Sequence, residues 1–319
     1  MKSPSITIVT PTYNRCQALA RAIDSVRAQT VSDYEHVIVD DGSTDNTGEM
    51  VAGYGDKRIR YFSLPHRCGA NTARNLAIQK ARAPVLGFLD SDDEYQPFRL
   101  QHTLDILEAN PQTPLMLSSY AVQRKSGAGS AVNIGGVVGG ENFERALAWR
   151  LVHIAGTSIT ARRDAARRIG GFNPVLRRMQ DLDFLLRMAK TGPVVLSDRT
   201  DWIKHNSPDA ITLGASVGVV EAFGDLIKYN DCYESSYHEQ IPYFVATRIL
   251  REVRKLRLGR AGRAFIENIK SPSLGFSACH LIQSYLSGKK LVAEVKSGFN
   301  LMAPDKASVS GSRRMSGDQ

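Results

Sequence analysis

The chain has 319 residues, of which 42% are hydrophobic and 23% are charged, as is usual for a globular protein. No uninterrupted apolar run approaches the roughly 20 residues of a membrane-spanning helix, and residues 1–15 lack the profile of a signal peptide. The net charge of +9 lies in residues 245–319, which hold 14 basic and 5 acidic side chains, so the rest of the chain is neutral.

Cysteine usage indicates a reducing compartment. The four cysteines are scattered, without the spacing of a metal or redox site, and are expected to be free thiols. They are Cys16, Cys68, Cys232 and Cys279. No Asn-x-Ser/Thr glycosylation signal occurs either, so we expect a cytoplasmic protein.

Strands and helices alternate over the first ninety residues. Short β-branched or apolar runs predict the strands, and apolar residues three and four apart predict the helices. Strands are expected at 6–10, 36–39, 58–62 and 84–89, and helices at 17–29, 45–51 and 71–81. Pro11 is expected to end the first strand, and Asp45 to cap the second helix. This order predicts an α/β fold with a mostly parallel, doubly wound sheet and right-handed crossovers.

The second half of the chain is less regular. Residues 125–140 are rich in Gly, Ser and Ala and are expected to form a loop or a weak hairpin. Helices are expected at 99–109, 141–149 and 182–189, and strands at 115–122 and 157–160. Beyond residue 207 helical patterns dominate, with an apolar stripe in a basic helix at 245–256, and the last fifteen residues are expected to be disordered.

The strongest local feature is the acidic sequence Asp90-Ser91-Asp92-Asp93, which follows the buried strand expected at 84–89. In open α/β sheets, ligands bind outside the carboxyl ends of the strands. Asp90 and Asp92 point the same way on extended backbone, so they could share a hard cation such as Mg²⁺ or Mn²⁺, with diphosphate oxygens completing its shell. The simpler interpretation is a solvated acidic turn before a helix that Pro97 opens.

Two common phosphate-binding signatures are absent from the sequence. Neither a Gly-rich turn after the first strand nor a Walker-type loop occurs, so dehydrogenase and P-loop classes are disfavoured. A diphosphate would then be held through a metal rather than at a helix N-terminus.

Four motifs, taken together, resemble the family 2 inverting glycosyltransferases with the GT-A fold. The resemblance covers residues 4–210 and excludes the basic tail. The motifs are Val9-Thr10-Pro11-Thr12-Tyr13-Asn14-Arg15, Val37-Ile38-Val39-Asp40-Asp41-Gly42-Ser43, Gly69 with Ala73-Arg74-Asn75, and Phe88-Leu89-Asp90-Ser91-Asp92-Asp93, followed by Gly170-Gly171-Phe172 and Gln180-Asp181-Leu182-Asp183.

The resemblance implies a catalytic domain at 1–210, with a nucleotide-binding half at 1–93 and an acceptor half at 94–210. A helical C-terminal region at 211–304 and a disordered tail at 305–319 would follow it.

The resemblance also implies a donor site for a uridine or thymidine diphosphate sugar. Asp41 would accept a hydrogen bond from the base, Tyr13 would lie against it, and Arg74 would contact the nucleotide. The remaining donor-site residues would be Thr10 and Pro11, through their backbone, with Asp90 and Ser91. The alternatives are an Asx-turn for Asp41, a core aromatic ring for Tyr13 and a surface ion pair for Arg74.

Asp90 and Asp92 match the DxD motif of the family. Asp92 would bind Mn²⁺ or Mg²⁺ directly, Asp93 would be a second ligand, and His205 resembles a later histidine that can reach the metal or the diphosphate. The alternative for His205 is a structural role. The metal would neutralise charge on the leaving diphosphate.

Asp181 is implied to be the general base that takes the proton of the acceptor hydroxyl. The alternative is an ordinary N-cap aspartate at the start of the helix at 182–189. The family usually has Glu-Asp here, whereas this chain has Gln180-Asp181, which puts acceptor binding in question.

The implied activity is a metal-dependent inverting hexosyltransferase that acts on a glycan or lipid-linked saccharide in polysaccharide biosynthesis. The basic tail could lie on anionic membrane at the inner face of the cell membrane, or pack on the catalytic domain. Nucleic-acid binding is not expected, because no aromatic residues interleave the basic ones. The alternatives are a non-catalytic nucleotide-sugar sensor or scaffold and, less favoured, a sugar-1-phosphate nucleotidyltransferase, which needs a basic Gly-rich loop after the first strand.

Overall fold

The structure is a computed structural model, and it describes residues 3–124, 127–205, short stretches between 226 and 261, and 278–302. Strands and helices alternate in its first half, as expected. The strands are β1 (Ile6–Thr12), β2 (Tyr34–Asp40), β3 (Ile59–Ser63) and β4 (Val85–Phe88). The helices between them are α1 (Cys16–Arg27), α2 (Thr47–Gly53) and α3 (Ala70–Lys80).

The second half adds strands of both directions to the same sheet. Its strands are β5 (Glu94–Tyr95), β6 (Leu115–Arg124), β7 (Gly127–Ala131), β8 (Gly136–Val138), β9 (Ile159–Arg162) and β10 (Val194–His205). Its helices are α4 (Arg99–Ala109), α5 (Gly140–Ala148), the 3₁₀ turn η1 (Gly156–Ser158), α6 (Arg163–Arg168), α7 (Gln180–Ala189) and α11 (Ala278–Met302).

The sheet runs in the order β3-β2-β1-β4-β9-β6-β10-β5. The four strands from β3 to β4 are parallel, as is the pair β6 and β10. Strand β9 joins the two halves antiparallel to both β4 and β6. The carboxyl ends of β1, β2 and β4 therefore share one edge of the sheet, which is where the candidate residues lie.

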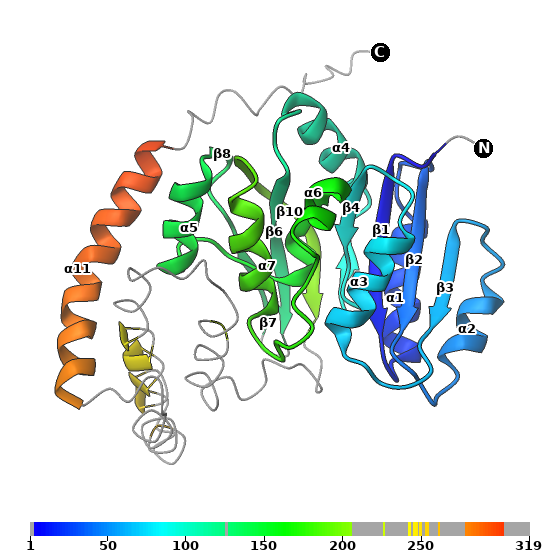
Figure 1. Cartoon of the computed structure of the whole chain (residues 1–319), viewed down its shortest axis with the longest axis horizontal. Helices are drawn as coiled ribbons and strands as arrows, with labels where there is room; N and C mark the ends of the chain where they lie inside the picture. The colour runs from blue at the N-terminus through cyan, green and yellow to red at the C-terminus, as the bar shows by residue number, and fades with distance from the viewer. Residues whose placement is uncertain are drawn as a thin grey trace.

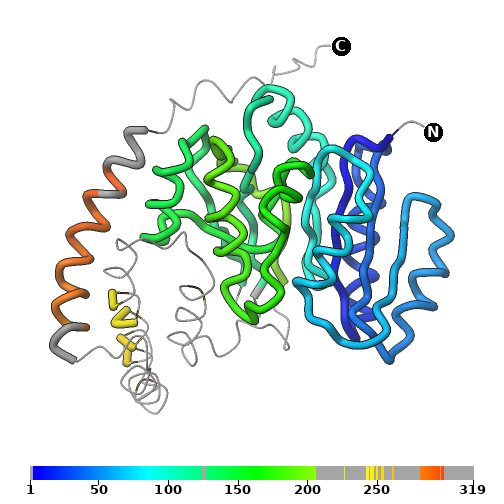
Figure 2. Tube along the Cα trace, viewed as in Figure 1, coloured from blue at the N-terminus to red at the C-terminus, as the bar shows by residue number. Residues whose placement is uncertain are grey.

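Helices cover both faces of the sheet and make three layers (Figure 1). Helices α3, α5, α6 and α7 bury their apolar sides in the largest core cluster, whereas α1 and α4 pack on the opposite face. Figure 2 shows that β3 and α2 lie at one end of the molecule and α11 at the other.

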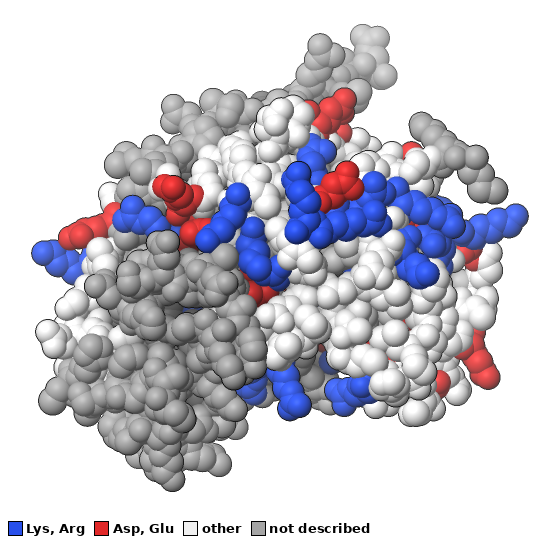
Figure 3. Space-filling view, in the orientation of Figure 1, with Lys and Arg blue, Asp and Glu red and all other residues white. Residues whose placement is uncertain are grey.

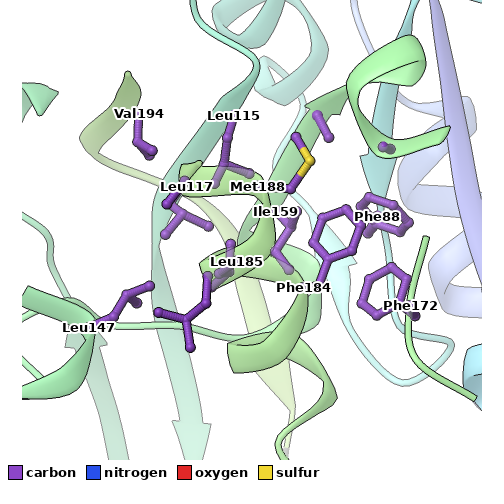
Figure 4. Close-up of a cluster of buried hydrophobic side chains, with 14 of the residues drawn as sticks. Phe88, Leu115, Leu117, Leu147, Ile159, Phe172, Phe184, Leu185, Met188 and Val194 are labelled. Atoms are coloured by element: carbon purple, nitrogen blue, oxygen red, sulfur yellow. The ribbon is translucent and has the colours of Figure 1, made fainter. Parts of the chain in front are cut away.

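Three phenylalanine rings fix α7 against the carboxyl end of β4 (Figure 4). Phe172 and Phe184 stack with centroids 4.2 Å apart, and Phe88 meets them edge-on at 5.3 and 5.8 Å. Phe88 stands two residues before Asp90, and Phe184 stands three residues after Asp181. This aromatic packing therefore brings two distant acidic segments together.

The expectation that Pro11 ends the first strand is wrong, because β1 continues to Thr12 and pairs with β2 throughout. Proline is tolerated here because the backbone N–H groups of residues two apart in a strand point to the same side. Val9, two residues earlier, offers its carbonyl to Leu89 on the β4 side, and ladder pairing with β4 has ended beyond it. The missing N–H of Pro11 therefore faces a side where no strand partner remains.

The described part of the C-terminal region packs on helices from the second half of the sheet region. Leu226, Val245 and Leu281 belong to the same core cluster as α5 and α7, and the Tyr243 ring lies 5.6 Å from that of Trp149. No helix among the described residues is long and apolar enough to cross a membrane. The tail expected to be disordered at 305–319 lies outside the described residues.

Candidate active site

The predicted donor residues gather where β1, β2 and β4 end. Thr10 and Pro11 are buried in β1, and the Thr10 hydroxyl hydrogen-bonds His36 within the sheet, at 2.9 Å. The Thr10 side chain is therefore engaged within the sheet, and the contact of its backbone with a ligand stays a prediction. Tyr13 is half-buried just beyond the strand, and the guanidinium of Arg67 lies 4.4 Å from the centre of its ring.

Asp41 is 3% exposed and does not make the Asx-turn considered as its alternative role. The neighbouring Asp40 makes a local bond, because its Oδ1 accepts the N–H of Ser43, three residues on, at 2.8 Å. The Asp41 carboxylate instead accepts the backbone N–H groups of Cys68, at 2.6 Å, and Gly69, at 2.8 and 3.0 Å. It thus anchors the loop that enters α3, and its remaining lone pairs could accept a further donor.

Arg74 points from α3 into the centre of the site. Its Nη2 lies 2.7 Å from Asp90 Oδ1, and its guanidinium lies over the ring of Phe172 at 5.3 Å. Its side chain is only 6% exposed, so this is a buried pair and not the surface pair considered above. Burial by itself would lower the pKa of Arg74, but Asp90 and Asp181 raise it, so Arg74 stays positively charged.

The DxD turn, residues 90–93, carries three carboxylates in three different environments. Burial by itself would raise the pKa of Asp90, but Arg74 holds it below its ordinary value. Asp92 Oδ2 pairs with Arg15 Nη1 at 2.9 Å, and its backbone carbonyl accepts a hydrogen bond from Arg21 at 2.7 Å. Ser91 is buried between these two acids.

Asp93 is the most buried acid of the turn, at 1% exposure. Burial raises its pKa to about 7, with Lys204 opposing the shift and Asp90 adding to it. The Thr157 hydroxyl donates to its Oδ2 at 2.6 Å, and the backbone N–H of His205 donates to its Oδ1 at 3.3 Å. Both oxygens are therefore already engaged within the protein.

Asp181 lies in the first turn of α7, where a helix dipole favours a carboxylate. It is not the N-cap, a position held by Met179, and its buried Oδ1 has no hydrogen-bond partner among the described residues. Burial raises the pKa of Asp181, and Arg74 opposes that shift. A half-buried carboxylate with an unsatisfied oxygen beside the DxD turn is suited to accept a proton.

Lys204 and His205 come from the end of β10. Burial by itself would lower the pKa of Lys204, but Asp93 and Asp90 raise it above the ordinary value. The imidazole Nε2 of His205 lies 3.0 Å from Glu94 Oε2. The structure thus brings the backbone of His205 to Asp93, while its ring faces Glu94.

The residues fit a divalent cation in one respect. Among the described residues, no three His, Cys, Asp or Glu side chains converge as a ready-made metal cage. Mg²⁺, however, is commonly held by one or two carboxylates and completed by substrate phosphates and water. Asp92 offers such a carboxylate oxygen, which pairs with Arg15 in this structure. Asp93 is buried beside Asp90, and a cation would offset the negative charge of these acids.

Several contact residues were not predicted from the sequence. Thr157 and Glu94 gave no local signal, and Arg15 was noticed only as part of a motif. Asn75 was likewise only a motif residue, yet its side chain accepts the N–H of Phe172 at 2.8 Å and donates to its carbonyl at 2.7 Å. These bonds hold the segment that leads to Asp181.

Comparison with known proteins assigns the family. Residues 7–170, about half of the chain, match the profile described as "Glycosyl transferase family 2". The chain belongs to this family.

Relatives and solved structures agree with the assignment. An uncharacterised glycosyltransferase of Rickettsia typhi is 27% identical over 225 residues, which is 69% of this chain and 70% of the relative. The succinoglycan biosynthesis protein ExoO of Rhizobium meliloti is 39% identical over 108 residues, 34% of this chain and 31% of its own. The crystal structure of S. aureus TarS 1–349 in complex with UDP has a TM-score of 0.59 at 18% identity, covering 91% of both chains.

The structural likeness confirms the expected GT-A fold of this family 2 glycosyltransferase. The mannosyltransferase PcManGT of Pyrobaculum calidifontis, in complex with GDP-Man and Mn²⁺, has a TM-score of 0.54 at 18% identity and covers 95% of this chain and 88% of its own. At such identities the likeness concerns the fold, so the roles of individual residues depend on the geometry above.

Proposed function

We propose that this family 2 glycosyltransferase moves a hexose, with inversion, from a UDP- or dTDP-sugar to a hydroxyl of a glycan or lipid-linked saccharide. The observation that carries the proposal is the carboxylate of Asp181. Its oxygen Oδ1 is buried without a partner among the described residues, and the charges of Arg74, Asp90 and Lys204 act on it from the donor side of the site.

In the proposed donor site, the nucleotide lies over the carboxyl ends of β1 and β2. Asp41 accepts a hydrogen bond from the base while it keeps the backbone of Cys68 and Gly69, and Tyr13 lies against the base. Thr10 and Pro11 line the pocket through their backbone. The proposal draws support from TarS, whose structures contain UDP and, in another crystal, UDP-GlcNAc.

Asp90 and Ser91 face the sugar diphosphate in this proposal, and Asp92 holds Mn²⁺ or Mg²⁺, with His205 as a further candidate ligand. The oxygens of Asp93, also expected as a ligand, accept hydrogen bonds from Thr157 and His205. When bound, the cation would offset the charge that develops on the leaving diphosphate. The residues of the chain contribute in the same direction. Arg74 is buried and Lys204 half-buried near the DxD turn, and cations shielded from water act strongly on a reacting group.

Asp181 acts as the general base. It takes the proton of the acceptor hydroxyl while that oxygen attacks the anomeric carbon from the side opposite the diphosphate. The first turn of α7 and the Phe88, Phe172 and Phe184 packing hold it at that position.

The acceptor is proposed to be a growing polysaccharide or its lipid-linked precursor. The support is the similarity to two relatives, the succinoglycan biosynthesis protein ExoO and a putative teichuronic acid biosynthesis glycosyltransferase of Bacillus subtilis, TuaG, which is 35% identical over 106 residues. This setting would place the enzyme in the cytoplasm, with its basic C-terminal region near anionic membrane.

The test is the release of nucleoside diphosphate from a panel of nucleotide sugars with Mn²⁺, with and without chelator. We expect a UDP- or dTDP-sugar to be consumed, and the chelator to stop the reaction. Asp181→Asn should lower kcat at least 100-fold and leave the donor KM within a few-fold, since the base acts on the acceptor. Asp164→Asn, at an acid whose side chain is 79% exposed on α6, is the matched control.

The alternatives give different results. A nucleotide-sugar sensor would bind a donor without turnover, and Asp181→Asn would change nothing. A nucleotidyltransferase would release pyrophosphate from a nucleoside triphosphate and a sugar phosphate.

A further inference from the structure

Thr157 makes two hydrogen bonds to the DxD turn from a position far along the chain. It lies in η1, just before β9, and is fully buried. Its hydroxyl oxygen accepts the backbone N–H of Asp90 at 3.1 Å, and its proton is donated to Asp93 Oδ2 at 2.6 Å. One side chain thus holds both the first and the last acid of the turn.

Asp93 extends this connection to β10. Its second oxygen accepts the backbone N–H of His205 at 3.3 Å, and its own N–H donates to the carbonyl of Asp90 at 3.0 Å. The carboxylate therefore links the turn after β4, the η1 segment and the end of β10. Asp92, by contrast, has a side chain that is 17% exposed and that pairs with Arg15.

The backbone around Thr157 is shaped for this role. A Cβ at the preceding Gly156 would lie 2.9 Å from Asp90 Oδ2, so a larger residue there would displace that carboxylate. The guanidinium of the buried Arg99 also donates a hydrogen bond to the carbonyl of Thr157, at 3.4 Å. Metal ligands are placed precisely only when neighbouring groups hold their side chains in position.

We infer that Thr157 and Asp93 form a brace that positions the DxD turn, and that Asp93 acts through this brace and not as a metal ligand. The part of this inference that concerns the metal rests on the proposed function, in which Asp92 binds the cation. The brace itself follows from the hydrogen bonds alone. Thr157 and Asp93 are thus positioning residues.

The role of Asp93 differs from metal ligation in a way that variants can detect. An asparagine at 93 keeps the shape of aspartate, can accept from His205 through its oxygen, and can donate to the Thr157 hydroxyl through its amide. It therefore keeps the brace, whereas it would lose most of the binding strength of a ligating carboxylate. Thr157→Val keeps the size of threonine and removes the brace, and Thr157→Ser restores the hydroxyl.

The first measurement is hydrogen exchange of the full chain, followed by mass spectrometry of peptides covering residues 88–95. Thr157→Val should raise exchange in this segment about tenfold, while Thr157→Ser should match the unmodified protein. Thr103→Val is the control, because Thr103 is also buried and its hydroxyl has no partner among the described residues. This readout needs neither metal nor donor, so it decides the brace even if no nucleotide sugar is consumed.

The second measurement is Mn²⁺ affinity by electron paramagnetic resonance in the presence of UDP. Thr157→Val should weaken it about tenfold, as loss of a supporting hydrogen bond beside a metal ligand typically does. Asp92→Asn should weaken it at least tenfold more than Asp93→Asn does. The donor KM should rise with Thr157→Val more than kcat falls, with rescue by Thr157→Ser.

Two results would overturn the inference. One is unchanged exchange at residues 88–95 in Thr157→Val, and the other is a loss of Mn²⁺ affinity in Asp93→Asn equal to that in Asp92→Asn. Failure of the proposed function looks different: the unmodified protein would release no nucleoside diphosphate from any donor, while the exchange result would still stand.

Discussion

Arg74 interacts with two acids from different segments of the site, Asp90 and Asp181. It pairs with Asp90 at 2.7 Å, and its charge also lowers the pKa of Asp181, which burial otherwise raises. A general base has to be deprotonated to act, so its pKa sets the acid limb of the pH profile. The donor side of the site thereby tunes the residue proposed to activate the acceptor.

This tuning predicts a pH dependence. For a base with a raised pKa, kcat falls as the pH drops through that pKa, so the acid limb should lie above the usual range of an aspartate, which is about 3.9. Arg74→Gln removes a charge that lowers the pKa of Asp181 and should move the limb to still higher pH. The measurement is kcat against pH at saturating donor, with Arg177→Gln, at an exposed site, as the control. An unchanged limb in Arg74→Gln would contradict the assignment.

Gly156 gives a second prediction at the same scale. Its φ is not in the left-handed region, so alanine is compatible with the backbone, but the added Cβ would lie 2.9 Å from Asp90 Oδ2. Gly156→Ala should displace the Asp90 carboxylate and weaken UDP binding about tenfold, measured by calorimetry with Mn²⁺. Gly139→Ala, where the Cβ meets open space, should bind normally. Equal binding by both variants would show that the contact is unimportant.

At the scale of elements, α3 is held at both ends. Asn71 near its start and Asn75 at its middle bond the backbone of the segment that leads to Asp181, at 2.7–2.9 Å. At its end, Arg167 of α6 donates to the carbonyls of Ile78, Gln79 and Ala81. Arg167 therefore caps the C-terminal end of α3. Basic side chains also form a band across the face of the molecule shown in Figure 3.

The capping predicts a stability difference between neighbouring arginines. Arg167→Gln should lower the free energy of unfolding by about 1 kcal/mol, because the last carbonyls of α3 lose their charged donor. Arg168→Gln should change it by less than about 0.5 kcal/mol, since among the described residues the exposed Arg168 makes no hydrogen bond to α3. Urea unfolding followed by circular dichroism compares the two. Equal effects would mean that the cap adds nothing.

The limits of sequence reasoning also appear at the element scale. The apolar runs of β1, β2 and β4 were predicted because buried parallel strands are uniformly apolar. The 12-residue strand β10 was missed, because Ser197 to Asp201 are polar and two register shifts at Thr200 destroy its alternation. Helix α6 has only six residues, too few for a periodic signal.

The candidate site was predictable only where its chemistry is local. The DxD turn, Asp41 and Asp181 stand in recognisable motifs next to strand or helix ends. The hydrogen bond from Thr157 to Asp93 joins residues 64 apart in sequence, and no pattern in one sequence indicates such a pair. The difference between the half-buried Asp92 and the buried Asp93 likewise arises from packing around β9 and β10.

For the whole molecule, the C-terminal region was expected either to lie on membrane or to pack on the catalytic domain. In the described residues, α11 contacts α5, and Leu281 joins the main core. Its opposite side exposes Ile282 and Leu286, at 62% and 64%. Packing on the domain is thus observed for one face of α11, and membrane contact stays a prediction.

Gly288 of α11 tests this packing through the sign of a stability change. In an isolated helix, Gly→Ala stabilises by about 1 kcal/mol. Here the added Cβ would collide with the ring of Tyr243, so Gly288→Ala should instead destabilise the protein by about 1–3 kcal/mol. Thermal unfolding measures the difference, with Ser287→Ala, at an exposed position, as the control. A rise in Tm for Gly288→Ala would show that α11 does not pack on Tyr243.

The most direct test of the account is a crystal structure of the protein with Mn²⁺ and UDP or dTDP. We expect the diphosphate at the DxD turn, Mn²⁺ within bonding distance of Asp92, and Asp41 facing the base. Asp92 still paired with Arg15, and the nucleotide bound away from the ends of β1, β2 and β4, would contradict the account.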